Sequence, residues 1–446
     1  MCVNMSESTL LENGFVFTMD SKNRVLENFD ILIQDGKISS IERTGEIRNR
    51  YRFDQVIDAT NKAIIPGLIS THFHSHIITR GLIDSYLSLG LQKALEKFYY
   101  PILEKATVDD IYFESLTSYG EALKSGITCV NDMYTKMEGC AKAAEEIGIR
   151  ASLSEEASDL LPGQPTLSDN ENLFRRRNNT ANKRITVLFG VEWIPVCSSE
   201  FLFKARELAD KYKTGIHVHL CESLDELKYC SEKYRKRPTE VAFEHGILGE
   251  DVVAAHFVWP NPKEVRLIEE TKTHISHCII QNLKCGNGIS PIDTMIQKGI
   301  NVSLGTDAYT NDFDMFQVMK YASLIQKVNN LDPSLIPPQQ SLKMATINGA
   351  RALHFEKDIG SIEVGKKADL CLIDLDGLHY QPLLTGRYSN LAANLIYSGH
   401  CSDVETVFVD GKRVVDNHRL VGIDETKVKE KIKDIALQIF DRAKIL

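Results

Sequence analysis

The sequence contains no apolar run long enough to cross a membrane, because its longest runs fall far short of the about 18 residues that a spanning helix needs. It also has no excess of basic residues: 52 Lys and Arg stand against 61 Asp and Glu, which gives a net charge of -9. Nucleic acids and anionic membranes favour basic patches, so neither is expected as a partner.

Paired cysteines are missing as well. The ten cysteines are scattered, with no Cys-x-x-Cys pair, which is typical of reduced thiols in a cytosolic protein. The first residues lack the basic start and apolar core of a signal peptide. Neither an internal repeat nor a low-complexity tract is evident. We therefore expect a cytoplasmic globular protein.

The middle of the chain alternates between strand and helix. Amphipathic helical stretches separate most of the strand candidates, which lie at 63–74, 127–133, 149–154, 185–193, 215–220, 252–257, 273–277 and 300–305. Strands that alternate with helices in this way predict a parallel (β/α)₈ barrel of TIM type, which needs about 250 residues. A doubly wound open sheet is the alternative.

Both ends of the chain are rich in short strand candidates. They lie at 10–19, 31–34, 38–43 and 55–58 near the start and at 369–374, 404–409 and 412–415 near the end. We expect the two ends to join in a small β-sandwich. The predicted division is 1–62 for the first part of the sandwich, 63–358 for the barrel, and 359–446 for the second part of the sandwich and a C-terminal helix.

Histidines gather where the predicted strands end. His72 and His74 are spaced by one residue, so on a strand both imidazoles would point to the same face. Imidazole is a preferred ligand of zinc and related metals. Active sites of barrels lie at the carboxyl ends of the strands. Later strand ends carry further polar residues: His217, His219, Glu222, His256, His277 and Asp307.

These residues can perform metal-assisted hydrolysis. A divalent ion held by neutral imidazoles and a carboxylate lowers the pKa of bound water to about 7. Glu222 follows His219 closely enough to pass a proton to a leaving nitrogen. Asp307 can bind the metal and take the proton from the attacking water, and His256 can hydrogen-bond the developing oxyanion.

Several motifs, in order, resemble the amidohydrolase superfamily, and within it the deaminases and chlorohydrolases of nitrogen heterocycles, such as thioadenosine/adenosylhomocysteine deaminases and triazine hydrolases. They are Pro-Gly-Leu-Ile-Ser-Thr-His-Phe-His at 66–74, Ile-His-Val-His-Leu-Cys-Glu at 216–222, Ala-Ala-His-Phe-Val-Trp at 254–259, Ser-His-Cys-Ile-Ile-Gln-Asn at 276–282 and Leu-Gly-Thr-Asp at 304–307. The resemblance implies one zinc or iron ion bound by His72, His74, His219 and Asp307. It also implies Glu222 and His256 as acid/base and polarising groups.

The chain departs from the thioadenosine/adenosylhomocysteine deaminases at two places. Those enzymes carry a histidine after strand four, where this chain has Glu192. They also carry a glutamate directly after a Trp-Pro pair, whereas here Tyr100-Pro101 is followed by Glu104 at a shifted spacing. Both contacts to a purine nucleoside are therefore in doubt, and adenosine-type substrates become a minority interpretation.

Glu192 admits three interpretations. As a pocket anion it would bind a cationic or NH-rich substrate, such as an amino-heterocycle, an amidine or a guanidine. As a bridging ligand it would recruit a second metal, and as a structural residue it would pair with a basic neighbour. Among the other histidines, His76 is expected in a loop and His217 behind a metal ligand. His277 is expected either to support a metal ligand from behind or to contact the substrate pocket.

The sequence thus predicts a metal-dependent aminohydrolase. Hydroxide on the metal attacks an amidine-like carbon of a nitrogen heterocycle or guanidino-type small molecule, Glu222 protonates the ring nitrogen, and ammonia leaves. The alternatives are expulsion of chloride or an alkylamine, and a binuclear cyclic amidohydrolase that uses Glu192. A metal-binding protein without turnover is disfavoured, since acid/base groups are present. The expected partners are one divalent ion, zinc before iron, and a small-molecule substrate; a homo-oligomer stays open.

Overall fold

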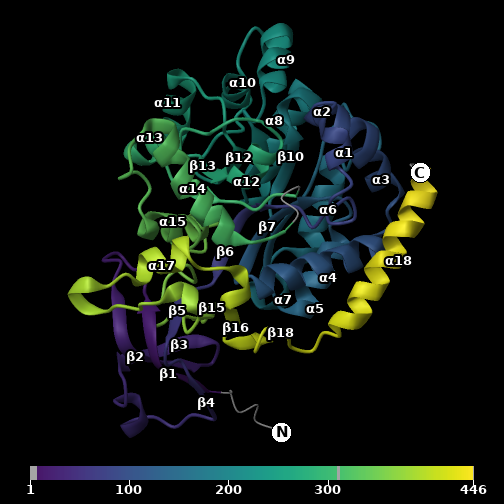
Figure 1. Ribbon diagram of the computed structural model, residues 1–446. Coiled ribbons are helices and arrows are strands. Elements are labelled where there is room, and N and C mark those ends of the chain that lie inside the picture. Colours follow the sequence, from purple (N-terminus) through teal and green to yellow (C-terminus); the bar gives the residue numbers. More distant parts are fainter. Residues whose placement is uncertain (1–7, 309–311, 445–446) are drawn as a thin grey trace.

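The structure, a computed structural model, describes residues 8–308 and 312–444. Its strands form two parallel sheets from the middle of the chain and one mixed sheet from the two ends. Figure 1 shows the mixed sheet below the rest of the molecule, with purple and yellow-green segments side by side. None of the described helices is long and apolar enough to cross a bilayer.

The parallel strands follow one another in sequence order. The first sheet contains β6 (Leu68–Phe73), β7 (Ile127–Tyr134), β8 (Arg150–Glu155) and β9 (Ile185–Val187), and the second contains β10 (Phe189–Trp193), β11 (Ile216–Leu220), β12 (Val252–His256), β13 (His274–His277) and β14 (Val302–Leu304). The predicted strand 185–193 is thus divided at Leu188, whose N–H donates to the carbonyl of Leu153. A parallel bridge between Phe73 and Asp307 links the first strand to the segment after the last.

Helices follow these strands along the chain, which gives a TIM-barrel-like α/β fold. The longer ones are α4 (Val108–Lys124), α5 (Glu138–Ile147), α6 (Leu167–Arg177), α8 (Ser199–Tyr212), α9 (Leu224–Tyr234), α11 (Pro262–Thr271) and α14 (Met315–Asn330). The shorter ones are α1 (Asp84–Leu87), α2 (Leu91–Ala94), α3 (Tyr100–Lys105), α7 (Thr180–Lys183), α10 (Pro238–Glu244), α12 (Ile279–Lys284), α13 (Ile292–Gln297), α15 (Pro338–Met344), α16 (Ile347–Ala352) and α17 (Leu391–Tyr397). Side-chain caps fix the residue at which several helices begin. At the start of α4, for example, the Thr107 hydroxyl accepts a hydrogen bond from the Asp110 N–H.

The mixed sheet joins the two ends of the chain. Its order is β18 (Arg419–Leu420), β17 (Lys412–Asp416), β16 (Val404–Val409), β15 (Leu370–Asp374), β5 (Lys62–Pro66), β1 (Thr9–Phe17), β2 (Val25–Gln34) and β3 (Lys37–Arg43), and β4 (Gln55–Asp58) also pairs with β1. The helix α18 (Glu425–Ala443) then runs back along the parallel-sheet region beside α3 and α4 (Figure 1).

The predicted strand 63–74 is in fact two strands in different sheets. Its first half is β5, which pairs with β15 in the mixed sheet, and its second half is β6. Gly67 lies between them, and a Cβ at this position would lie 2.0 Å from the Thr128 Oγ1 atom. Only glycine fits such a close crossing. The turn there directs β6 so that His72 lies in its last part.

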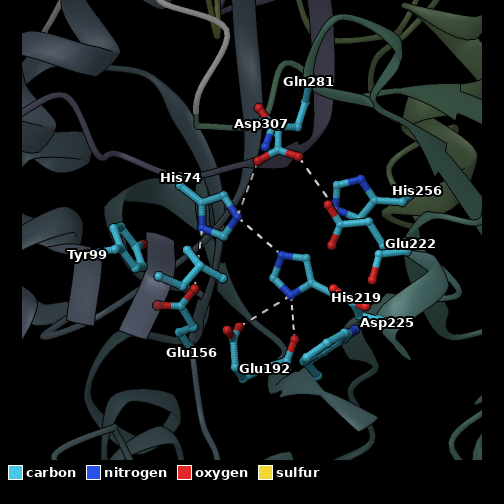
Figure 2. Close-up of a pocket in the computed structure, with 13 residues that line it drawn as sticks. His74, Tyr99, Glu156, Glu192, His219, Glu222, Asp225, His256, Gln281 and Asp307 are labelled. Carbon is cyan, nitrogen blue, oxygen red and sulfur yellow. Dashed lines mark hydrogen bonds and ion pairs between the residues drawn. The ribbon is translucent and has the colours of Figure 1, made fainter. Parts of the chain in front are cut away.

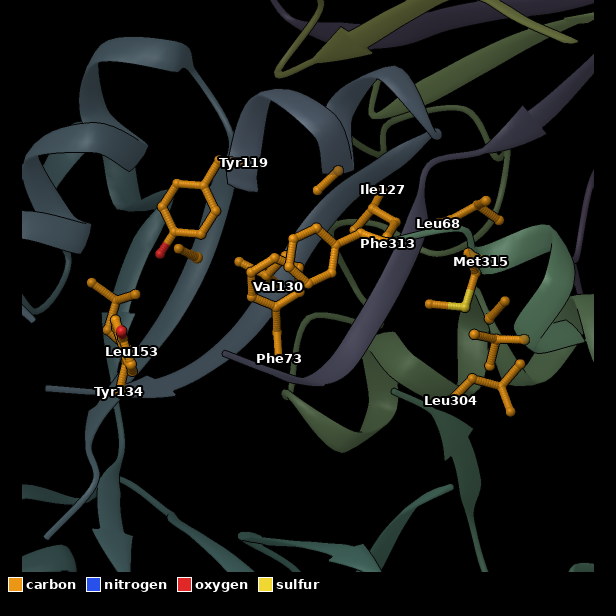
Figure 3. Packing of buried hydrophobic residues seen from close by; sticks show 14 of the residues in the cluster. Leu68, Phe73, Tyr119, Ile127, Val130, Tyr134, Leu153, Leu304, Phe313 and Met315 are labelled. Carbon is orange, nitrogen blue, oxygen red and sulfur yellow. The ribbon is translucent and has the colours of Figure 1, made fainter. Parts of the chain in front are cut away.

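Aromatic packing supports the end of β6. Phe73 is fully buried and its ring centroid lies 4.3 Å from that of Phe313, which follows β14 in the chain. Tyr119 of α4 packs against the other side of Phe73, with 6.0 Å between ring centroids. Figure 3 shows this cluster between β6, β7 and the start of α14. The packing therefore holds the backbone next to His72 and His74 in place.

Candidate active site

Three imidazoles converge where the parallel strands end. The Nε2 atoms of His72 and His74 are 3.2 Å apart, and those of His74 and His219 are 3.3 Å apart. The Asp307 carboxylate closes the group, with Oδ1 at 3.6 Å from His74 Nε2 and Oδ2 at 3.6 Å from His72 Nε2. The structure thus brings together the four residues that the sequence predicts as metal ligands.

The hydrogen bonds of these histidines fix their tautomers. His74 Nδ1 faces the carbonyl of Met133, and His219 Nδ1 lies 2.5 Å from the carbonyl of Glu192. A carbonyl only accepts, so each Nδ1 carries the proton, and each Nε2 presents a lone pair to the centre when its ring is neutral. Burial and the neighbouring imidazoles also lower the pKa of His72 and of His74 well below the usual value.

Such a donor set fits a divalent cation. The distance of about 3.3 Å between neighbouring Nε2 atoms equals the edge of a tetrahedron whose zinc–nitrogen bonds are about 2.0–2.1 Å long. The Asp307 Oδ2 atom is buried and has no hydrogen-bond partner among the described residues. A cation at the centre would satisfy this oxygen and the lone pairs together, so the residues fit a metal site.

A relay of hydrogen bonds supports His72 from behind. His72 Nδ1 lies 2.8 Å from His217 Nε2, and His217 Nδ1 lies 3.3 Å from the Ser154 hydroxyl. If the Nδ1–H group of His72 donates a hydrogen bond, His217 Nε2 accepts it. The Nδ1–H group of His217 then donates the next hydrogen bond, to the Ser154 hydroxyl. His217 thus lies behind a predicted ligand, as the sequence interpretation expected, and does not line the pocket.

The two predicted acid/base groups lie on the opposite side of the pocket from His74. His256 Nε2 is 3.5 Å from Asp307 Oδ2 and 3.8 Å from Glu222 Oε1. The Asn287 side-chain amide donates to Glu222 Oε1 at 2.8 Å, and Asn282 Oδ1 contacts His256 Nδ1 at 3.1 Å. Burial raises the pKa of Glu222 to about 7. A carboxyl with this pKa can both give and take a proton near neutral pH.

Glu192 lies behind His219 rather than between two metal positions. Its Oε2 atom is 3.4 Å from His219 Nδ1, whereas the predicted metal contact of that ring is Nε2. Its Oε1 atom accepts a hydrogen bond of 2.8 Å from the Tyr100 hydroxyl. Among the described residues it contacts no lysine or arginine, and its basic partner is His219: burial lowers the pKa of that ring, but Glu192 outweighs burial and raises it to about 9. This placement is unsuited to a ligand that bridges two metals.

Glu156 is a pocket residue that the sequence interpretation missed. It follows β8 directly, lies 3.9 Å from His74 Nδ1 through Oε1, and is 2% exposed. Burial, and then the negative charge of Glu192, raise the pKa of Glu156 well above the usual value. The signal that could have identified it is its position just after a strand, which it shares with His74 and Glu222.

Other singled-out residues lie outside the pocket. His76 is in a loop, as expected, yet it is buried and contacts the Tyr134 hydroxyl at 2.7 Å. His277 is fully buried and neither ring nitrogen has a hydrogen-bond partner among the described residues. Glu104 is exposed and pairs with Lys105. Thus Glu104 does not replace the glutamate of the nucleoside deaminases, and Tyr99 of the neighbouring segment lines the pocket instead.

The pocket over this centre is acidic. Figure 2 shows Glu156 and Glu192 on one side of His74 and His219, and Asp307 with His256 on the other. None of the described residues that line it is a lysine or arginine. The lining consists of His74, Leu95, Tyr99, Glu156, Glu192, Trp193, His219, Glu222, Ser223, Asp225, His256, Gln281 and Asp307.

Two relatives with named activities align with nearly the whole chain. The chain is 38% identical over 440 residues to a 5'-deoxyadenosine deaminase of Methanosarcina barkeri, which spans 97% of this chain and 98% of the relative. It is 36% identical over 439 residues to a 5-methylthioadenosine/S-adenosylhomocysteine deaminase of Thermoanaerobacter pseudethanolicus, at 97% and 99% coverage.

Solved structures agree with this relationship. An adenosine deaminase from Xanthomonas campestris with bound zinc superimposes with a TM-score of 0.90 at 26% identity, covering 98% of this chain and 99% of that one. A triazine hydrolase from Arthrobacter aurescens, at 22% identity and a TM-score of 0.86, shares the fold over 96% of this chain and 99% of its own. The model of the amidohydrolase family matches residues 63–414. The chain therefore belongs to the amidohydrolase family.

Proposed function

We propose that the protein is a metal-dependent aminohydrolase that removes ammonia from an amidine-like carbon of a nitrogen heterocycle or guanidino-type molecule. The observation that carries the proposal is the convergence of three imidazole Nε2 atoms and the Asp307 carboxylate beside Glu222 and His256. A metal site with an adjacent acid/base pair suits hydrolysis rather than metal storage. The deaminase relatives support the same reaction class.

The proposed metal ligands are His72, His74, His219 and Asp307. Zinc is the preferred ion, because nitrogen-rich tetrahedral sites suit it and the similar deaminase from Xanthomonas campestris binds it. A bound divalent ion of this kind lowers the pKa of a coordinated water to about 7 and so supplies the nucleophile. Iron is the second choice.

The chain's own groups would then move the protons. Asp307 would take the proton from the attacking water and pass it to the amino group, which leaves as ammonia. Glu222 would donate a proton to the ring nitrogen and recover one from the new hydroxyl group as the C–N bond breaks, while His256 hydrogen-bonds the oxygen on which negative charge develops. The pKa of Glu222, raised to about 7 by burial, suits this exchange at neutral pH. Asn287 holds the Glu222 carboxyl by a hydrogen bond of 2.8 Å.

Two other leaving groups stay open for the same site. Chloride or an alkylamine could depart from the same tetrahedral carbon, as the fold shared with a triazine hydrolase allows. A binuclear cyclic amidohydrolase is less favoured, because the Glu192 carboxylate lies on the Nδ1 side of His219. The sequence relatives act on adenosine derivatives by name, so a purine nucleoside is the second candidate substrate.

A combined metal and turnover experiment tests this function. The zinc-loaded protein should contain about one ion per chain and should release ammonia from at least one compound in a panel of purine nucleosides, pterins, pyrimidines, triazines and guanidino compounds. Glu192→Gln should keep the same metal content. Two ions in the parent protein with one lost in Glu192→Gln would reject the mononuclear site, and no ammonia from any compound would reject the deaminase assignment.

We also propose the finer architecture and location. The two parallel sheets form one closed eight-stranded barrel in this proposal, supported by the bridge between Phe73 and Asp307, and the end segments form a β-sandwich. The second division stays after residue 358, but the first moves from residue 62 to residue 66, because β5 pairs within the mixed sheet. All described cysteines are free thiols, which supports a cytoplasmic location. A small-molecule substrate is the expected partner, without nucleic acid or membrane, and a homo-oligomer remains a prediction.

A further inference from the structure

Glu156 and Glu192 form a carboxyl pair that the proposed chemistry does not use. The backbone carbonyl of Glu192 accepts from His219 Nδ1, and the side-chain Oε2 atom lies 3.4 Å from the same nitrogen, while Oε1 and the Glu156 carboxyl have no role in the proposed reaction. Glu156 follows β8 and Glu192 lies within β10, so the pair depends on two strand ends that meet at one side of the pocket (Figure 2). The two carboxyls are 2% and 5% exposed as whole residues, so water reaches them poorly.

Such a pair is costly unless a donor satisfies it. Two adjacent buried carboxyls repel each other when both are ionised, and each is expensive to remove from water. Here the Oε2 atoms of both residues lack a hydrogen-bond partner among the described residues. The Tyr100 hydroxyl donates to the other oxygen of Glu192. Tyr99 hydrogen-bonds Glu156, and the two carboxyls hydrogen-bond each other, so they share one proton. A bound group with two N–H donors can replace that proton and satisfy both buried carboxyls.

The charge of the pocket lining indicates which kind of hydrogen-bond donor would bind to the two carboxyls. Besides Asp307, the described lining contains four carboxyl groups, those of Glu156, Glu192, Glu222 and Asp225, and no lysine or arginine. Burial raises the pKa of Glu192, but its hydrogen bond with His219 outweighs burial and lowers that pKa, so this carboxylate repels an anion and attracts a cation. A planar cation with two parallel N–H donors matches carboxylate oxygens in a bidentate manner and is weakly hydrated, so it is the chemistry that suits two buried carboxyls best.

We propose that Glu156 and Glu192 bind an amidinium or guanidinium group of the substrate, at a position separate from the C–N bond that is cleaved. This inference rests on the proposed aminohydrolase function and adds to it the class of substrate. The substrate would be an amino-heterocycle that carries a planar cationic group. The pair then sets specificity, while Glu222, His256 and Asp307 carry the reaction.

An isosteric pair of probes tests the inference without turnover. Phenylguanidine is a planar cation at neutral pH and phenylurea is its neutral counterpart of similar shape. Their dissociation constants are measured by calorimetry on the zinc-loaded protein and on Glu156→Gln, Glu192→Gln and Asp225→Asn, each with its metal content determined. Asp225 is the matched control, because it lines the same pocket but is exposed at the rim.

We expect the parent protein to bind phenylguanidine at least about ten-fold more tightly than phenylurea, the scale of one charge-assisted hydrogen bond. Glu156→Gln and Glu192→Gln should each lose most of this preference, and Asp225→Asn should keep most of it. Unchanged phenylurea affinity shows that the variants are folded. No preference in the parent protein, an equal loss in Asp225→Asn, or loss of a second metal ion in the glutamate variants would overturn the inference.

The outcome is separable from the test of the proposed function. If no heterocycle releases ammonia but the guanidinium preference depends on the two glutamates, the cation site stands and the deaminase assignment fails. If neutral heterocycles are deaminated and phenylguanidine shows no preference, the deaminase assignment stands and the cation site is rejected. In the ammonia-release panel, the inference further predicts higher kcat/KM for compounds with an amidinium or guanidinium group than for their neutral analogues.

Discussion

The Nδ1 atom of His72 lies 2.8 Å from the Nε2 atom of His217, two residues before His219 on the same strand. A metal-ligating histidine needs a partner on its other nitrogen, which fixes the tautomer and the ring orientation. In most sites that partner is a carboxylate or carbonyl. Here it is a second imidazole, so the binding of metal by His72 depends on a neutral His217.

The first prediction follows from this contact. His217→Phe removes the acceptor for the Nδ1 proton of His72, so zinc affinity should fall by about 10- to 100-fold. Competition with a chelator of known affinity measures the change. His277→Phe is the matched control: it is also a buried histidine at a strand end, but its nitrogens have no partner among the described residues. Equal losses in both variants would contradict the role of the contact.

The second prediction concerns the proton donor. Glu222→Gln keeps the shape of the side chain but cannot transfer a proton, so kcat should fall by about 10²- to 10⁴-fold while zinc content stays the same. Because burial raises the pKa of Glu222 to about 7 and its acid form donates the proton, kcat/KM of the parent enzyme should decline as pH rises above about 7. Full turnover by Glu222→Gln would show that another group donates.

The third prediction concerns the connection between the mixed sheet and the parallel sheets. Arg150 of β8 is 1% exposed and donates to both oxygens of Asp369, at 3.0 and 3.1 Å, and to Asp410 at 2.6 Å. Arg150→Met leaves these carboxylates without a cation, so the free energy of unfolding should fall by about 3–5 kcal/mol. Chemical denaturation measures it.

The control for this change is an exposed pair. Arg24 contacts Asp20 at 2.6 Å, but its side chain is 53% exposed. Arg24→Met should therefore cost only about 0–1 kcal/mol, because water screens the pair. An equal loss of unfolding free energy in the two variants would show that the buried ion pair does not stabilise the contact between the sheets.

The fourth prediction is a pH dependence of stability. Burial raises the pKa of Asp132 to about 7 in the folded protein, although Ser75 and Tyr119 donate to it. In the unfolded chain its pKa is about 3.9, so the unfolded state loses this proton first. The group's contribution to stability is present below pH about 4 and is lost as pH rises to about 7.

Asp132→Asn cannot ionise, so it should flatten the decline of the melting temperature between pH 4 and 7 in the metal-free protein. Scanning calorimetry at several pH values measures the slope. Other buried carboxyls with raised pKa values, such as Glu155 and Glu226, cause part of the decline, and this part should remain in both proteins. An Asp132→Asn slope as steep as that of the parent would contradict the prediction, and Asp376→Asn, at an exposed position, is the control.

Much of the fold could be predicted because its signals are local. Alternation of apolar strands with amphipathic helices, and β-rich ends, follow from periods of two and 3.6 residues that can be read along the chain. The predicted strand 63–74 shows the limit of such reading. Its apolar run continues without interruption, yet β5 and β6 belong to different sheets. The division follows from pairing with β15 on one side and with β7 on the other, both distant in sequence, and Gly67 permits it because a Cβ there would lie 2.0 Å from Thr128 Oγ1.

By itself, the sequence determined the residue types and spacings of the site: His72 and His74 at one strand end, His219 with Glu222 at another, and His256 and Asp307 at two more. Strand periodicity and the rule that strand ends share one face are enough to bring these together. Only the tertiary structure decided that Glu192 lies on the Nδ1 side of His219 and that Glu156 lies beside it. The side-chain positions of such pairs depend on the register and twist of separate strands, which no local pattern of residues records.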